Sequence, residues 1–217
     1  MLRSDRRLLG LAVGLSGLAG FVDAIGFLEA GGFFISFMSG NSTRLAVGLA
    51  EGTTAALAAV ALIIGFVSGC ILGFVVGHLA GTRRRPAVTA LVTLLLIAAA
   101  LLMPWHKELA LAAMVLAMGA ENAALADNGE VKVGLTYMTG ALVRLGQAAA
   151  HGLLGIDRPA WVADLSLWMG LVTGATLGAL AQLSMDHTAL WIAAGLAATL
   201  TILAALLQRR APATRPH

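Results

Sequence analysis

Six consecutive residues within an apolar stretch of this sequence carry groups that could bind a polar solute. The stretch covers 33–50, FFISFMSGNSTRLAVGLA, and its polar centre is Ser39, Gly40, Asn41, Ser42, Thr43 and Arg44. A helix that begins near Ser39 would present unpaired N–H groups and a positive dipole end, with Arg44 about one turn further on. This pattern predicts an anion-binding site. The alternative is that Arg44 only ties helices together through a buried acid.

The same pattern occurs again 100 residues later, where Tyr137-Met138-Thr139-Gly140 precedes Arg144. Aromatic, Met, hydroxyl, Gly and Arg keep their places, which indicates an internal repeat. Ala141 stands where the first copy has Asn41, so a site built from both copies would be asymmetric.

Two acids lie in the apolar segments that precede the two polar stretches. Asp23 and Glu121 are the candidates for proton coupling or for pairing with the two arginines, and a plain buried ion pair is the alternative for each. Asn122 follows Glu121 directly and would offer a neutral hydrogen-bonding group to the same cavity.

The elements that must position these residues are membrane helices. The 217 residues are 59% hydrophobic and 12% charged, with a mean hydropathy of +0.89, whereas a soluble domain carries about 25% charged residues. The net charge of +3 does not indicate nucleic acid, because the basic residues stand at the ends of apolar spans. Cys70 is the single cysteine, so no disulfide within the chain is possible. No metal-binding or cofactor-binding motif occurs, so we expect no metal and no cofactor.

Apolar windows predict an all-α polytopic protein with about six transmembrane helices and two broken or re-entrant segments. The first repeat, 1–103, contains spans at 8–30, 54–80 and 86–103 and the polar segment 33–50. The second repeat, 104–217, contains spans at 108–127, 160–183 and 188–207 and the polar segment 131–151. The first span is interpreted as an uncleaved helix rather than a signal peptide.

The distribution of basic residues favours six crossings over eight. With six, Lys107 alone faces out, Arg44 and Arg144 lie within the membrane, and every other Lys and Arg faces the cytoplasm. With eight, Lys132 and the arginines at 83–85 would move outside. Three spans per repeat is an odd number, so the two repeats, each of about 100 residues, would be inverted, an architecture of transporters and some channels. Both termini would be cytoplasmic.

The segment 20–45, GFVDAIGFLEAGGFFISFMSGNSTRL, resembles the YoaK family of bacterial multi-pass inner-membrane proteins. The match rests on Val-Asp-Ala at 22–24 and on Met-Ser-Gly-Asn-Ser at 38–42, usually Met-Thr-Gly-Asn-Thr in the family. Ser39 and Ser42 keep the hydroxyl groups. The resemblance implies a bacterial inner-membrane location and a domain of unknown function, and it supplies no substrate.

We expect a transporter of a small polar, perhaps anionic, solute rather than an enzyme, and a passive channel is the variant of the same architecture. The midplane site is expected to include Asp23, Ser39, Gly40, Asn41, Thr43, Arg44, Glu121, Asn122, Tyr137, Thr139, Gly140 and Arg144. One alternative is an intramembrane hydrolase with Ser39 as nucleophile and His151 or His78 as base. Another is a non-transporting membrane subunit whose polar motifs only secure packing. The expected partners are the lipid bilayer and the solute, while proton coupling and a homo-oligomer stay open.

Overall fold

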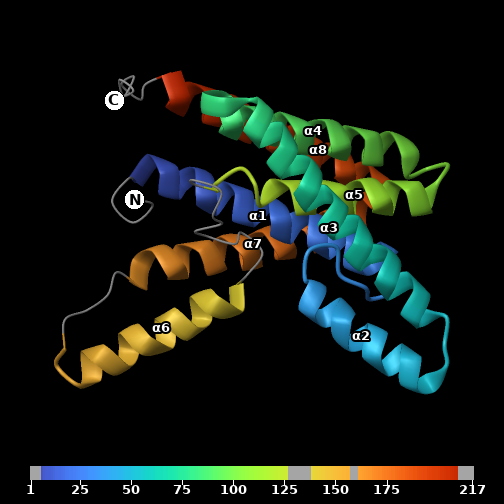
Figure 1. Ribbon diagram of the computed structural model, residues 1–217, viewed down its shortest axis with the longest axis horizontal. Helices are drawn as coiled ribbons and strands as arrows, with labels where there is room; N and C mark the ends of the chain where they lie inside the picture. Colours follow the sequence, from blue (N-terminus) through green and yellow to red (C-terminus); the bar gives the residue numbers. More distant parts are fainter. Residues whose placement is uncertain (1–5, 127–137, 157–160, 210–217) are drawn as a thin grey trace.

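The computed structural model (Figure 1) describes residues 6–126, 138–156 and 161–209, and every regular element in these ranges is a helix. The elements are α1 Arg6–Glu29, α2 Met38–Glu51, α3 Ala55–Leu79, η1 Gly81–Arg83, α4 Arg84–Leu102, α5 Lys107–Glu121, α6 Met138–Leu153, α7 Trp161–Met185, η2 Asp186–Thr188 and α8 Ala189–Arg209.

Long apolar helices identify the chain as a helical membrane protein. Four stretches of the described residues are long and apolar enough to cross a membrane, namely Arg6–Glu29, Ala55–Leu79, Gly81–Leu102 and Trp161–Arg209, the last of which contains both α7 and α8. Large side chains such as Leu57 and Leu183 are about three-quarters exposed, at 72% and 75%. Lipid rather than water is the solvent that suits such a surface.

Close contacts between backbones hold α1 against α7. A Cβ atom at Gly20 would lie 2.2 Å from the carbonyl oxygen of Leu171, and one at Gly174 would lie 1.9 Å from that of Gly17. Only glycine fits at such contacts, which are typical of helices packed inside a bilayer. The Ser16 hydroxyl donates to the carbonyl of Leu167 over 2.9 Å. The contacts advance together along both helices, from Ser16 and Leu167 to Gly20 and Leu171, so the two helices run in the same direction.

The pair α3 and α5 repeats this packing with other residues. A Cβ atom at Gly119 would lie 2.2 Å from the carbonyl oxygen of Phe66, and one at Gly69 would lie 2.3 Å from that of Leu116. Gly119 stands 99 positions after Gly20, and Leu171 stands 105 positions after Phe66. Each of these contacts in one pair therefore has its counterpart in the other. The pair α4 and α8 runs antiparallel and is joined by a hydrogen bond between Thr93 and Thr201, 3.1 Å long.

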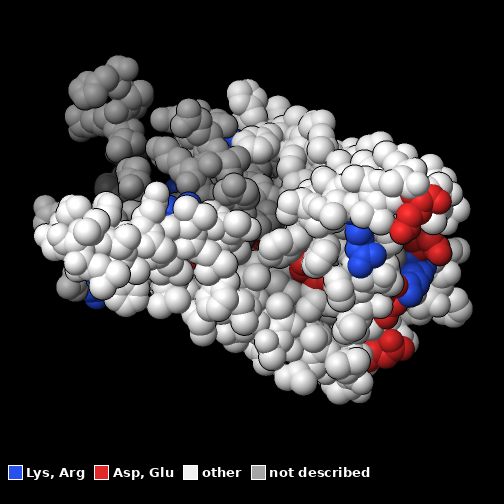
Figure 2. All heavy atoms as spheres, turned by 90° about the horizontal axis from the view of Figure 1, so that it is seen from below, with Lys and Arg blue, Asp and Glu red and all other residues white. Residues whose placement is uncertain are grey.

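The two ends of the molecule differ in charge. The arginine-rich end, on the left in Figure 1, carries Arg6, Arg7, Arg83, Arg84, Arg85 and Arg209. The acidic end, on the right, carries Glu29, Glu51, Glu108 and Asp186 together with Lys107. On the face shown in Figure 2 the visible acidic side chains gather mainly toward the right-hand side, and the middle of the surface is largely uncharged.

The shorter helices α2 and α6 begin near the centre of the molecule and point to opposite ends (Figure 1). α2 packs on α3, and α6 packs on α7. The segment expected at 33–50 consists of a loop that returns toward the centre and then of α2, after a turn at Gly31 and Gly32 with φ of 63° and 86°. Of the segment expected at 131–151, the part before Met138 lies outside the described residues.

The expected span at 108–127 needs a correction, because α5 ends at Glu121. The side-chain amide of Asn122 donates to the carbonyl of Met118 over 3.0 Å, and the chain continues through turns. The Arg84 guanidinium donates to the carbonyl of Ala126 over 3.3 Å, which places that residue at the arginine-rich end. The segment 107–126 therefore spans the distance between the two ends with a helix of only 15 residues.

Candidate functional site

Asp23 binds the backbone of the loop that precedes α2. Its Oδ1 accepts the N–H groups of Ile35 at 2.8 Å and Ser36 at 2.7 Å, and the residue is 7% exposed. These bonds satisfy buried donors that the irregular loop would otherwise leave unpaired. The expected pairing of Asp23 with Arg44 is wrong, because this carboxylate is occupied by the loop.

Asn41 fixes the same loop from the other side. Its Nδ2 donates to the carbonyl of Phe34 at 2.7 Å, and its Oδ1 accepts the Phe34 N–H at 3.0 Å, with the residue fully buried. The amide thus pairs with both backbone groups of one residue, as a neighbouring strand would. Asp23 and Asn41 together hold the loop before α2 in the core.

Arg44 lies beside this loop with no acidic partner in the described part of the chain. Its Cζ is 4.8 Å from the centre of the Phe33 ring, a cation–π contact, and the side chain is half-buried. Ser39 and Thr43 are exposed, and the Thr43 hydroxyl donates to the carbonyl of Ser39 at 3.3 Å. Gly40 packs against the ring of Phe34.

The start of α2 offers fewer free N–H groups than an open anion site would. The N–H of Met38 donates to the carbonyl of Ser36 at 3.1 Å, and that of Gly40 donates to the carbonyl of Phe37 at 3.0 Å. An anion at this position would therefore depend mainly on the Arg44 guanidinium.

Arg144 pairs with an acid that was not among the expected site residues. Its Nε donates to Oδ1 of Asp164 at 2.8 Å, and the carboxylate side chain is 6% exposed. The expected pairing of Arg144 with Glu121 is therefore wrong. Asp164 stands 105 positions after Ala59, the same shift that relates Leu171 to Phe66 in the packing of the helix pairs. The first copy has Ala59 in the place of Asp164, so Arg44 has no equivalent acid to pair with there.

Glu121 is fully buried, and neither carboxylate oxygen has a hydrogen-bond partner among the described residues. It ends α5, next to the buried Asn122. A buried carboxylate without a partner costs several kcal/mol, on the order of 3–5, and no group among the described residues offsets this cost. Thr139 is exposed and Gly140 half-buried at the start of α6, and Tyr137 lies outside the described residues.

The expected residues form separate groups rather than one cluster of side-chain contacts. Asp23 and Asn41 meet at the loop, Arg44 lies on Phe33, and Arg144 binds Asp164. Three surface grooves of about 370–420 Å³ are lined by other residues. Within the described residues, Ser39 makes no hydrogen bond to a histidine, so no nucleophile–base pair is formed by this serine.

Comparison with known proteins identifies the family. Residues 11–203 match a family described as "Protein of unknown function (DUF1275)". The chain is 37% identical over 202 residues to the UPF0700 transmembrane protein RA0705 of Rhizobium meliloti (strain 1021), covering 93% of this chain and 88% of that protein. No solved structure matches. The resemblance to a YoaK-like family of multi-pass membrane proteins is thereby confirmed. This chain therefore belongs to the DUF1275 family of proteins of unknown function.

Proposed function

We propose that this protein transports a small polar solute across the bacterial inner membrane, with its arginine-rich end in the cytoplasm. Basic residues that flank membrane spans face the cytoplasm, which gives the orientation. The six crossings would be α1, α3, α4, α7, α8 and the segment 107–126. α2 and α6 would be the two re-entrant helices, and both chain termini would be cytoplasmic.

The matched contacts support two inverted repeats, α1 to α4 and α5 to α8. The packing of α1 on α7 corresponds to that of α5 on α3, and the packing of α2 on α3 corresponds to that of α6 on α7. α1 and α5 run in opposite directions (Figure 1), so the second repeat would be turned over relative to the first. Repeats of this kind place binding sites near the midplane, where helices are interrupted. α2 and α6 both begin at the centre of the molecule.

The single observation that carries the proposal is the fully buried Glu121 carboxyl without a hydrogen-bond partner among the described residues. Structural acids inside a membrane are paired, as Asp164 is with Arg144. An ionisable group without a partner marks an ion or substrate pathway. Glu121 would take up a proton or contact the solute during transport. If transport is coupled to protons, Glu121 is the residue that would carry the proton.

Arg44 supports a solute with negative charge. Its guanidinium stacks on Phe33 and has no ion pair within 6–126, 138–156 and 161–209. A guanidinium held in place by an aromatic ring keeps its donors available for a carboxylate or phosphate. Arg144 is the structural counterpart, because its Nε is paired with Asp164.

The test uses liposomes that contain the purified protein and an internal pH dye. A panel of amino acids, carboxylates, phosphate and nucleobases is added outside, and solute-driven internal pH changes are recorded. A response from the wild type that Glu121→Gln abolishes and Glu108→Gln preserves supports the proposal, because Glu108 lies at the acidic end. Uptake that is unaffected by Arg44→Ala refutes the assignment of Arg44 to the site.

A passive channel is separated from a transporter by counterflow. Unlabelled solute inside the liposomes accelerates entry of labelled solute through a transporter, whereas a channel shows no such acceleration. A protein that moves none of the solutes in either assay would be a non-transporting membrane subunit.

A further inference from the structure

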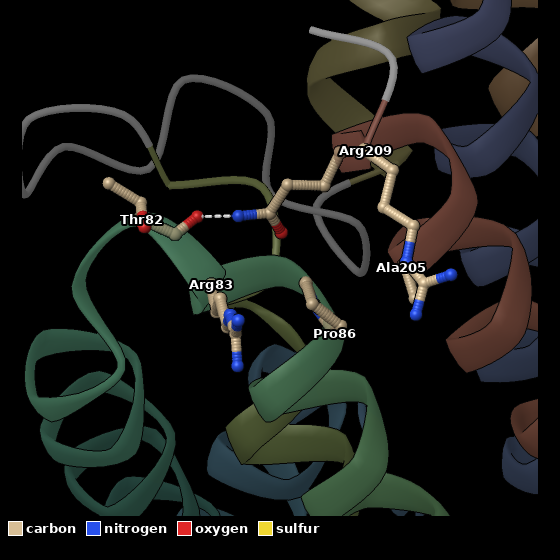
Figure 3. A pocket seen from close by; sticks show the side chains of 6 residues that line it. Thr82, Arg83, Pro86, Ala205 and Arg209 are labelled. Carbon is tan, nitrogen blue, oxygen red and sulfur yellow. Dashed lines mark hydrogen bonds between the residues drawn. The ribbon is translucent and has the colours of Figure 1, made fainter. Parts of the chain in front are cut away.

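A groove of about 420 Å³ lies at the arginine-rich end, between the start of α4 and the end of α8 (Figure 3). Its lining consists of Thr82, Arg83, Pro86, Ala205, Gln208 and Arg209. None of these residues belongs to the proposed transport site, so the groove is a separate feature of the molecule.

The groove follows from the small residues at this end of the α4–α8 pair. Pro86 and Ala205 line it with short side chains, and the side-chain amide of Gln208 bridges the two helices by donating to the carbonyl of Thr82 (Figure 3). The bridge fixes the spacing of the helix ends. Space therefore remains between the two helices beyond their closely packed middle.

Two arginines from different helices give the groove its charge. Arg83 and Arg209 are exposed, and neither guanidinium has an ion pair or hydrogen bond in the described part of the chain. No acid among the described residues lines the groove. The neighbouring Arg84 differs, because it donates to the carbonyl of Ala126 and lies 5.6 Å from the centre of the Phe74 ring. Arg84 is thus a packing residue, and the other two are available to an anion.

An apolar surface adjoins the groove on the α8 side. Ile202, Leu203 and Leu206 are exposed on the last turns of α8, directly before Arg209. A ligand that fits both features has a phosphate head for the two guanidinium groups and acyl chains for the apolar face. Basic pockets between membrane helices on the cytoplasmic side recognise anionic lipid headgroups in this way.

The arginine at position 83 has no basic counterpart in the second repeat. η1 begins at Gly81 with φ of 53°, and η2 begins 105 positions later at Asp186 with φ of 52°, so the two short helices correspond. The second copy has Thr188 in the place of Arg83, and its Asp186 binds His187 at 3.0 Å. The repeat alone therefore does not account for two free arginines around one groove.

We propose that this groove binds the phosphate of an anionic phospholipid headgroup, held between Arg83 and Arg209. The same oxyanion chemistry occurs in soluble phosphates, and the experiment distinguishes the two sources. The proposal is independent of transport activity.

Native mass spectrometry of the full chain in detergent tests the site. Phosphatidylglycerol and cardiolipin are titrated against the wild type, the double variant R83Q/R209Q and the control Arg6→Gln, with phosphatidylcholine as the neutral lipid. Arg6 is an exposed arginine at the same end that does not line the groove. We expect the double variant to lose about tenfold or more in affinity for the anionic lipids, and Arg6→Gln to keep wild-type affinity.

Two further measurements keep the result decisive. The variant R83K/R209K retains the charge and should retain most of the binding, which separates a lost site from a misfolded protein. Thermal unfolding is recorded with glycerol 3-phosphate and inorganic phosphate as the soluble arm. Stabilisation by these anions equal to that by lipid overturns the lipid assignment, and equal lipid binding by wild type and R83Q/R209Q overturns the site.

Discussion

Replacing Asp23 should destabilise the protein by releasing the loop before α2. In Asp23→Ala, the N–H groups of Ile35 and Ser36 lose their common acceptor while both residues stay buried. A hydrogen bond to a charged group contributes about 1.5–3 kcal/mol, so two such bonds predict a loss of about 3–6 kcal/mol. Asp23→Asn keeps one acceptor oxygen without the charge, and we expect about half of that loss.

The measurement is reversible unfolding in detergent, followed by circular dichroism and by labelling of a single cysteine. The variant Ser36→Cys, made in a Cys70→Ala background so that it carries the single cysteine, reports on the loop, because Ser36 is 3% exposed in the folded protein. Labelling at this position should become rapid when Asp23→Ala is added. Glu51→Ala is the matched control, since Glu51 is exposed and makes no ion pair with the described residues. Wild-type stability together with a protected Ser36→Cys in the Asp23→Ala protein would refute the capping role.

The other predictions concern packing, the ion pair and the buried acid. Gly174→Ala would place a Cβ 1.9 Å from a backbone oxygen of α1 and should cost about 1–3 kcal/mol, whereas Gly195→Ala has open space and should leave stability unchanged. A double-mutant cycle of Arg144→Ala and Asp164→Ala should give a coupling of about 0.5–1 kcal/mol, because the arginine is 42% exposed; a coupling of zero contradicts the pair. Glu121→Gln should unfold no more easily than wild type while it stops solute-driven proton movement, and a large loss of stability would show that the carboxyl has a partner.

The helical membrane fold could be predicted because it follows from the high apolar content of the sequence and from the length of its apolar stretches. Apolar runs gave α1, α3, α4, α7 and α8 within a few residues of their ends, since lipid demands long uncharged stretches. The end of α5 at Glu121 could not be predicted, because it depends on a local bond from Asn122 to Met118 and not on hydrophobicity.

The site was predicted as a set of residue types and not as a set of contacts. Asp23 and Asn41 were correctly expected to be inside the protein, but their partners are backbone groups of a loop whose path sequence does not reveal. Asp164 was not among the expected site residues, because a place near the end of an apolar segment gives no sign of burial. Its burial depends on how α6 lies on α7, which is a tertiary property.

The pairing of α1 with α7 also sets an order for assembly. Helices α3, α4 and α5 are neighbours in sequence and can pack as soon as they enter the bilayer. α1 must wait for a partner that begins at Trp161, more than a hundred residues after its own end at Glu29. At translation rates of about 5–20 residues per second, the glycine face of the first helix stays open to lipid and to other chains for on the order of ten seconds.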